Sequence, residues 1–102
     1  MVGSGPPLTW KECDDIFYVY ILKSKQDEKL YVGCTSDLKK RFFDHNKGLI
    51  VSTKPRRPFI VIYYEAYLSH DDAFEREHQL KRFGGSMTHL KKRIKKSLVL
   101  SR

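Results

Sequence analysis

A carboxylate, an imidazole and a guanidinium occupy positions where helical spacing places them beside apolar side chains. Glu77 lies three residues after Phe74 and three before Leu80, so on a helix it shares their apolar face. Arg41 and His45, four residues apart, flank the apolar stripe of an earlier helix. A carboxylate on an inward face costs free energy unless it meets a cation, a metal ion or hydrogen-bond donors. These side chains therefore form either a structural ion pair, such as Arg41 with Glu77, or a site for acid–base and metal chemistry.

Tyrosines supply a second group of side chains suited to chemistry. Tyr18 and Tyr20 fall on one face of a short aromatic and β-branched run, because side chains alternate along a strand. Tyr31 lies in the next such run, two residues before Gly33. Most strand tyrosines fill the core, yet a buried phenol needs a partner for its hydroxyl. Two phenols near a carboxylate and an arginine can therefore serve proton transfer.

The positive charge of the chain is concentrated at its C-terminal end. Residues 1–77 hold 12 basic and 12 acidic residues, whereas residues 78–102 hold 8 basic residues and no acid. The net charge of +8 therefore lies wholly in the last quarter, which is typical of a protein that binds a polyanion, most often nucleic acid. The alternative is a solvated basic helix that only keeps the protein in solution. The candidate nucleic-acid contacts are Lys91, Lys92, Lys95 and Lys96 at this end, and Lys54, Arg56 and Arg57 in a proline-broken segment.

Length and composition exclude several classes of protein. With 102 residues, 40% hydrophobic and 13% aromatic, the chain can form one autonomous core and is not a disordered protein. No stretch approaches the ~18 consecutive apolar residues of a membrane span, and the first seven residues lack a secretory signal pattern. Cys13 and Cys34 are too few for a disulfide framework and lack zinc-ligand spacing. We therefore expect a cytoplasmic protein without a membrane partner, associated with the nucleoid in a prokaryote.

Local patterns predict a mixed α+β domain in the order β-β-α-β-α-α. The expected strands cover 17–22, 30–33 and 59–64, and the expected helices cover 36–47, 70–82 and 86–97. Thr35 or Ser36 is expected to cap the first helix. Ser69 opens a capping box for the second helix, which Gly84-Gly85 ends.

The second predicted helix has one apolar stripe. The stripe consists of Ala73, Phe74, Leu80 and Phe83. Glu75 and Arg76 point off it, so no internal partner is expected for either side chain. Glu77 shares the stripe and does need one.

Five positions carry a recognisable pattern. Val19-Tyr20-Ile21 is followed by Tyr31-Val32-Gly33, then by Arg41 eight residues after that glycine, His45 four further on, and Glu77 in a downstream helix. In these residues the chain resembles the GIY-YIG nuclease superfamily, and especially its small standalone members. The resemblance covers about residues 16–97, the expected domain, between a flexible segment over 1–15 and a tail over 98–102. It implies a three-stranded antiparallel sheet flanked by helices, and phosphodiester hydrolysis assisted by one divalent metal ion.

The resemblance also implies a role for each matching residue. Glu77 matches the glutamate that binds the metal ion, here Mg²⁺ or Mn²⁺. Tyr20 and Tyr31 match the two motif tyrosines, one of which is usually the general base toward the attacking water. Arg41 matches the arginine that steadies the scissile phosphate, and His45 matches a histidine that positions or deprotonates the nucleophile in several relatives. Elementary chemistry agrees, because a phenol with a pKa near ~10 needs a nearby cation to ionise.

The chain departs from the family pattern in two places. Tyr18 stands where the first motif has glycine, and Cys34 follows Gly33 where some repair-type relatives carry lysine. The 102 residues include no second nucleic-acid-binding domain, so a protein partner that supplies specificity is expected, with the chain itself a monomer or weak dimer.

The sequence thus predicts a metal-dependent endonuclease that acts on DNA, with RNA as a second candidate substrate. One alternative is a catalytically weak or inert nucleic-acid-binding module that uses the basic C-terminal helix. The other is a structural domain with a buried ion pair.

Overall fold

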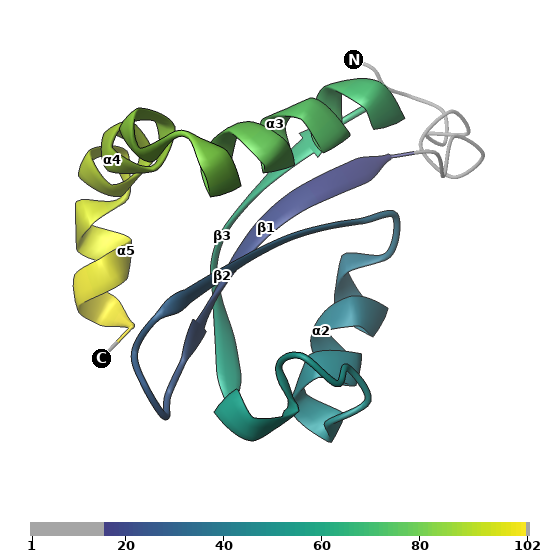
Figure 1. Ribbon diagram of the computed structural model, residues 1–102, viewed down its shortest axis with the longest axis vertical. Coiled ribbons are helices and arrows are strands. Elements are labelled where there is room, and N and C mark those ends of the chain that lie inside the picture. Colours follow the sequence, from purple (N-terminus) through teal and green to yellow (C-terminus); the bar gives the residue numbers. More distant parts are fainter. Residues whose placement is uncertain (1–15, 102) are drawn as a thin grey trace, which may run out of the picture.

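A three-stranded antiparallel sheet forms the framework of the protein (Figure 1). The structure is a computed structural model and describes residues 16–101. The strands are β1 (Phe17–Ser24), β2 (Leu30–Thr35) and β3 (Phe59–Tyr67), in the spatial order β2-β1-β3. The helices are α2 (Leu38–Lys47), α3 (His70–Arg82), α4 (Gly84–Arg93) and α5 (Lys95–Leu100), with a 3₁₀ turn, η1 (Lys54–Arg56), before β3. The predicted α+β class is confirmed.

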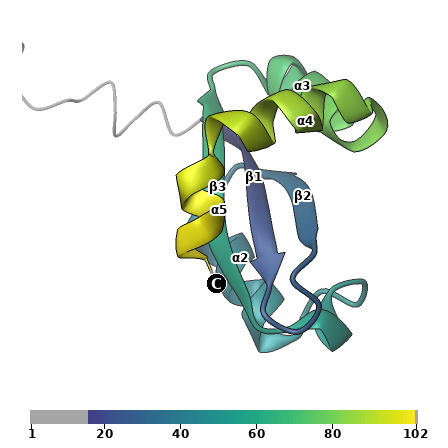
Figure 2. The ribbon, with the colours of Figure 1, turned by 90° about the vertical axis from the view of Figure 1, so that its left-hand side faces the viewer.

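The alternation of side chains along β1 divides the core into two layers. Val19 and Ile21 are fully buried on one face, where they pack with residues of α3 and α4. Tyr20 and Leu22 are buried on the other face, where α2 and Phe59 cover them. Figure 1 shows α2 apart from the other helices, and Figure 2 shows α5 alongside β3. The predicted separation of Tyr20 from Val19 and Ile21 is therefore confirmed.

The first helix begins later than the sequence predicts. Asp37, rather than Thr35 or Ser36, is the N-cap residue of α2, and its side chain accepts from the Lys40 N–H at 3.1 Å. The Thr35 hydroxyl instead accepts from the Asp37 N–H at 3.1 Å, which braces the turn between β2 and α2. At the other end Gly48 adopts a left-handed conformation (φ 80°), which confirms the predicted stop.

The C-terminal part of the chain is divided differently from the prediction. Gly84 and Gly85 form the first turn of α4 instead of a linker, and the preceding break lies at the extended residue Phe83. A second break lies at Ile94, whose buried side chain anchors the bend between α4 and α5. The predicted boundary after residue 97 falls inside α5, because Ser101 is buried and accepts from the Lys23 ammonium at 3.1 Å. The predicted N-terminal segment, 1–15, lies outside the described residues.

Helix α3 has the predicted bounds but a narrower apolar face. Ser69 caps it by accepting from the Asp72 N–H at 3.2 Å, as the capping box predicts. Ala73 and Leu80 are buried, whereas Phe74 and Phe83 are about half exposed or more. The buried face of α3 is therefore narrower than the predicted stripe. None of the helices within residues 16–101 is long and apolar enough to cross a membrane.

Candidate active site

A chain of hydrogen bonds joins three segments that are far apart in sequence. The Tyr20 hydroxyl on β1 lies 3.0 Å from Nε2 of His45 on α2, and Nδ1 of His45 lies 2.8 Å from the Thr53 hydroxyl. Because the Thr53 hydroxyl donates to the Ile50 carbonyl oxygen at 3.4 Å, it accepts from Nδ1–H of His45. This arrangement leaves Nε2 unprotonated and assigns the Tyr20 hydroxyl as its donor. All three side chains are buried.

Gly33 makes room for the Tyr20 phenol. The two residues are directly opposite in the β1–β2 pairing. A Cβ atom at position 33 would lie 2.3 Å from the Tyr20 hydroxyl oxygen and 2.4 Å from Cζ, which is far inside van der Waals contact. Only glycine lets the phenol cross β2 at this point. The motif glycine is thus explained by the tyrosine that it faces.

Aromatic rings surround the His45 imidazole. The ring centroid of Tyr31 lies 5.0 Å away, that of Phe59 5.9 Å and that of Tyr20 6.0 Å, each at a steep angle. The Tyr31 ring also lies 6.3 Å from the Tyr20 ring. Both predicted tyrosines therefore flank the predicted histidine, and Tyr20 alone of the two bonds to it.

Arg41 lies one helical turn before His45 and has an unmet donor. Its Nε is buried and has no hydrogen-bond partner within residues 16–101. The structural alternative, an ion pair between Arg41 and Glu77, is not what the structure shows, because the Glu77 carboxylate pairs with Lys81, one turn along α3, at 3.0 Å. A buried guanidinium N–H without a partner is unusual in a folded protein. It is suited to an anionic ligand such as a phosphate oxygen.

Burial sets the protonation states of the central pair. Desolvation, followed by the nearby Tyr31, raises the pKa of Tyr20 to about 12, although Arg41 acts in the opposite direction and Glu77 adds to the rise. Desolvation, and then the positive charge of Arg41, lowers the pKa of His45 below 6.5. At neutral pH the phenol is therefore protonated and the imidazole is neutral, which agrees with the hydrogen-bond assignment.

Glu77 comes from α3, the helix that packs on the opposite face of β1 and β2. Its side chain is only 14% exposed. Burial, and then the negative charge of Glu77, raises the pKa of the Cys34 thiol. Within residues 16–101 no group of three or more histidine, cysteine or acidic side chains could hold a metal ion. A single carboxylate fits a hard cation such as Mg²⁺, which keeps several waters and accepts phosphate oxygens. It does not fit a zinc centre.

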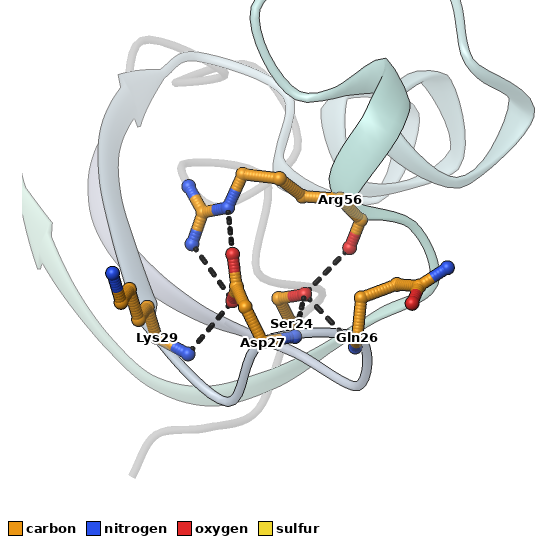
Figure 3. A network of polar contacts seen from close by, with 5 residues as sticks. All are labelled: Ser24, Gln26, Asp27, Lys29 and Arg56. Atoms are coloured by element: carbon orange, nitrogen blue, oxygen red, sulfur yellow. Dashed lines mark hydrogen bonds and ion pairs between the residues drawn. The ribbon is translucent and has the colours of Figure 1, made fainter.

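The predicted loop cation Arg56 ties the loop after α2 to the β1–β2 turn (Figure 3). Its Nε donates to Oδ2 of Asp27 at 2.9 Å, and this contact lowers the pKa of Asp27 to about 2. The Ser24 hydroxyl donates to the Arg56 carbonyl oxygen at 2.6 Å and accepts from the Gln26 and Asp27 N–H groups. The network thereby fixes the loop that supplies Thr53. A phosphate contact by Arg56 stays a prediction.

The remaining predicted cations lie in two places. Arg57 donates through Nε to the Lys54 carbonyl oxygen at 2.9 Å and so braces the same loop. The four C-terminal lysines are all exposed, two on α4 (Lys91 and Lys92) and two on α5 (Lys95 and Lys96). Helix α5 contacts β3, whereas Tyr31 lies on β2 at the opposite edge of the sheet. Four of the predicted catalytic residues therefore lie together on the face of the sheet that α2 covers: Tyr20, Tyr31, Arg41 and His45. Glu77 lies on α3, which packs on the other face, and its charge acts on the Tyr20 phenol. The predicted C-terminal contacts are not brought to this group.

A partly buried ion pair between Glu65 and Arg76 was missed by the sequence reasoning. Glu65 on β3 accepts two hydrogen bonds from Nε of Arg76 (3.1 and 3.2 Å) and one from Nη2 (3.0 Å), and it also accepts from the Tyr63 and Tyr67 hydroxyls. Arg76, expected to need no partner, therefore joins α3 to β3. The signal was present in the alternation Tyr63-x-Glu65-x-Tyr67, which places a carboxylate between two phenols on one face.

Comparison with known proteins identifies the family. A family model described as the GIY-YIG catalytic domain matches residues 16–91, a range that includes all five catalytic candidates. The chain belongs to the GIY-YIG family. Membership indicates nuclease-type activity in general. The resemblance predicted from the sequence is confirmed.

Similar proteins are small, and most of their length is matched. A UPF0213 protein of Staphylococcus haemolyticus is 42% identical over 67 residues, which are 65% of this chain and 80% of that protein. A UPF0213 protein of Haloquadratum walsbyi is 35% identical over 71 residues, 69% of this chain and 79% of that protein. The solution NMR structure of a UPF0213 protein from Bacillus halodurans is 32% identical and covers 74% of this chain and 85% of its own, with a TM-score of 0.46.

Proposed function

We propose that this GIY-YIG protein is a metal-dependent endonuclease that hydrolyses phosphodiester bonds in DNA, with RNA as a second candidate substrate. The observation that carries the proposal is the buried Tyr20–His45–Thr53 hydrogen-bond chain beside the unmet donor of Arg41. The unpartnered Arg41 N–H is unusual for a core that serves structure alone. Together the two features supply a route for a proton and a cation for a phosphate.

Tyr20 is suited to pass a proton rather than to act as a preformed phenolate. With a pKa raised to about 12, the phenol is almost entirely protonated at neutral pH. As a water oxygen attacks phosphorus, its proton passes to the Tyr20 oxygen while the phenolic proton moves to Nε2 of His45. The Nδ1–H bond to Thr53 keeps the imidazole in the accepting tautomer. The bond from phosphorus to the leaving oxygen then breaks with its electron pair on that oxygen, which takes a proton from a water molecule. The proton on Nε2 of His45 passes back to the Tyr20 oxygen, and the phenol gives its own proton to the hydroxide left by that water.

Arg41 balances the charge that develops on the phosphate. Its guanidinium is fixed on the same helix as His45 and has an N–H group to offer. A preorganised donor of this kind is strongest where the site is shielded from water. Its positive charge would stabilise the non-bridging oxygens of the transition state.

Glu77 would hold the divalent ion, Mg²⁺ or Mn²⁺. Such an ion, when bound, supplies positive charge to the phosphate and to the leaving oxygen. Lys81, now paired with the carboxylate, is 48% exposed and can swing into solvent when a cation takes its place. The chain itself contributes the carboxylate, the fixed guanidinium and the proton route.

Cleavage assays test this proposal directly. End-labelled single-stranded, duplex and branched DNA, and RNA, are incubated with the protein in Mg²⁺, Mn²⁺ or chelator. We expect metal-dependent cleavage that Glu77→Gln abolishes while nucleic-acid affinity is retained. The matched control is Glu75→Gln, an exposed carboxylate on the same helix, which should cut at the wild-type rate. Equal rates for Glu77→Gln and Glu75→Gln would contradict the assigned site.

A second function is favoured by one observation. Residues 78–102 contain no acid, and four of their lysines are exposed on α4 and α5. A nucleic-acid-binding module that cuts weakly or not at all would use this surface alone. Tight binding of all substrates with no cleavage in either metal would favour this alternative.

A further inference from the structure

An aromatic groove lies beside the candidate active site. Its volume is about 480 Å³, and its lining includes Tyr18, Leu38, Phe42, Val61 and Tyr64, with Lys39 among its polar residues. Tyr18 and Tyr64 come from the neighbouring strands β1 and β3, and their rings meet edge to face at 5.8 Å and 69°. Tyr64 is 54% exposed, so much of its ring is open to a ligand.

The groove and the catalytic residues share the same two elements. Tyr18 lies two residues before Tyr20 on the same face of β1, a separation of roughly 7 Å along a strand. On α2, Phe42 directly follows Arg41 and lies three residues before His45. A ligand in the groove would therefore lie about one nucleotide away from a phosphate held by Arg41.

We propose that this groove is a subsite for one nucleobase of the substrate strand, next to the bond that is cut. The inference rests on the proposed function. Bases stack on exposed aromatic rings whatever their identity, which suits Tyr18, Phe42 and Tyr64. The volume lies within the range of small-molecule sites and accommodates a single base. Lys39 offers a positive charge for the phosphate attached to that base.

The charge around the groove favours a nucleobase over a peptide or a second copy of this chain. Lys39 belongs to the lining, and Arg41 lies two residues further along the same helix. Asp37 also belongs to the lining, but its carboxylate is engaged in capping α2. A nucleotide matches the groove with its base and the cations with its phosphate.

The proposed subsite gives the Tyr18 ring a role in binding the base. It occupies the position at which the first family motif has glycine. A glycine there would remove the ring that packs against Tyr64 and would open one wall of the groove. The tyrosine therefore gives this chain a base-binding surface that the glycine form of the motif would lack.

The test combines protein variants with abasic oligonucleotides. Cleavage of a single-stranded oligonucleotide is compared with cleavage of a series in which one base at a time, near the cut bond, is missing. The variants are Tyr64→Leu, which removes the ring, and Tyr64→Phe, which keeps it. The matched control is Phe83→Leu, an equally large ring, 62% exposed, at the junction of α3 and α4.

We expect the Tyr64→Leu variant and one abasic substrate to lose the same stacking interaction. Tyr64→Leu should raise KM about 5- to 150-fold, the equivalent of one lost base–aromatic stack, with kcat little changed. One abasic position should raise KM for the wild type by a similar factor and have no further effect on Tyr64→Leu. Tyr64→Phe and Phe83→Leu should behave as the wild type. Fluorescence anisotropy of the same oligonucleotides, in the Glu77→Gln background, provides a readout of binding without cleavage.

Three outcomes would overturn the subsite alone, and a fourth would overturn it together with the proposed function. If Tyr64→Leu matches Phe83→Leu in KM and in affinity while the wild type cuts, the base does not use this groove and the nuclease proposal stands. If abasic positions have equal effects in the wild type and in Tyr64→Leu, the base is bound elsewhere. If Tyr64→Leu changes the sedimentation of the free protein, the groove is an interface between copies. Absence of any binding or cleavage by the wild type would refute the proposed function together with the subsite.

Discussion

A single methyl group added at Gly33 should disable this protein. In Gly33→Ala the new Cβ would lie 2.3 Å from the Tyr20 hydroxyl oxygen, 2.4 Å from Cζ and 2.9 Å from Cε1. Comfortable carbon contacts are about 3.5–4 Å, so the ring or strand β2 must move by more than an ångström. Tyr20 is 1% exposed and packed between β2 and α2, and has no free space to enter. The shift breaks its hydrogen bond to His45.

The expected loss of stability follows from these two effects. Overpacking a well-filled core costs about 1–3 kcal/mol, and losing a buried hydrogen bond costs about 0.5–1.5 kcal/mol. The free energy of unfolding should therefore fall by about 2–4 kcal/mol. In a domain of this size each kcal/mol corresponds to about 4–8 °C in Tm, so the decrease should be roughly 10–25 °C. Cleavage should be lost even below the new Tm, because the proton route from Tyr20 is broken.

Thermal unfolding followed by circular dichroism measures the effect. The matched control is Gly85→Ala in the first turn of α4, where an added Cβ meets nothing within 4 Å and Tm should stay equal or rise slightly. A second comparison places Gly33→Ala in a Tyr20→Leu background, where the clash is relieved and the additional cost should be smaller. A Gly33→Ala protein that unfolds within about 2 °C of the wild type would refute the reasoning, because ~1 kcal/mol alone should shift Tm further.

Four other expectations follow from the contacts described above. Tyr20→Phe should fold normally and cleave about 10²–10⁴-fold more slowly. Tyr31→Phe leaves the hydrogen bond between Tyr20 and His45 in place and should lose less of the cleavage rate. Similar rates for both variants would assign the general base to another group. Arg76→Met, which leaves the Glu65 carboxylate without its cation, should lower the free energy of unfolding in urea by about 1–3 kcal/mol. Burial raises the pKa of Tyr20, Tyr63 and Tyr67 to about 12. The free energy of unfolding should therefore keep its full value below pH 10 and decrease as the pH rises through 12. A flat profile over that window would contradict these shifts. Replacing Lys92, Lys95 and Lys96 with Gln should flatten the slope of log affinity against log salt concentration by about two to three units for duplex DNA. The slope should not change if these lysines only keep the protein in solution.

Local features of the chain were predictable because they depend on neighbours in sequence. The serine of the capping box at Ser69, the left-handed stop at Gly48 and the strand-forming runs each involve a few adjacent residues. The bounds of α3 were therefore correct to the residue. The start of α2 was wrong by two residues because three consecutive polar residues compete for the cap, and Asp37 is the one whose side chain reaches the Lys40 N–H.

The catalytic candidates were also predictable, for a different reason. Helical spacing places Arg41 and His45 one turn apart, and places Glu77 on the inward face of its helix. Together with the tyrosines and Gly33 these spacings identify the GIY-YIG family, which the match over residues 16–91 confirms. Spacing alone, however, could not decide what each side chain meets.

The tertiary structure determined which side chains the candidate site residues contact. Tyr20 and His45 are 25 residues apart and meet only because α2 packs over the face of β1 that carries Tyr20. Thr53, to which the sequence assigned no role in the site, completes the chain because the loop after α2 brings its hydroxyl to Nδ1 of His45. Glu77 meets Lys81 rather than Arg41, since a residue one turn away on the same helix is close whatever the rest of the chain does. Periodicity determines which face of an element a residue occupies, whereas its partners depend on which elements the packing of the core brings against that face.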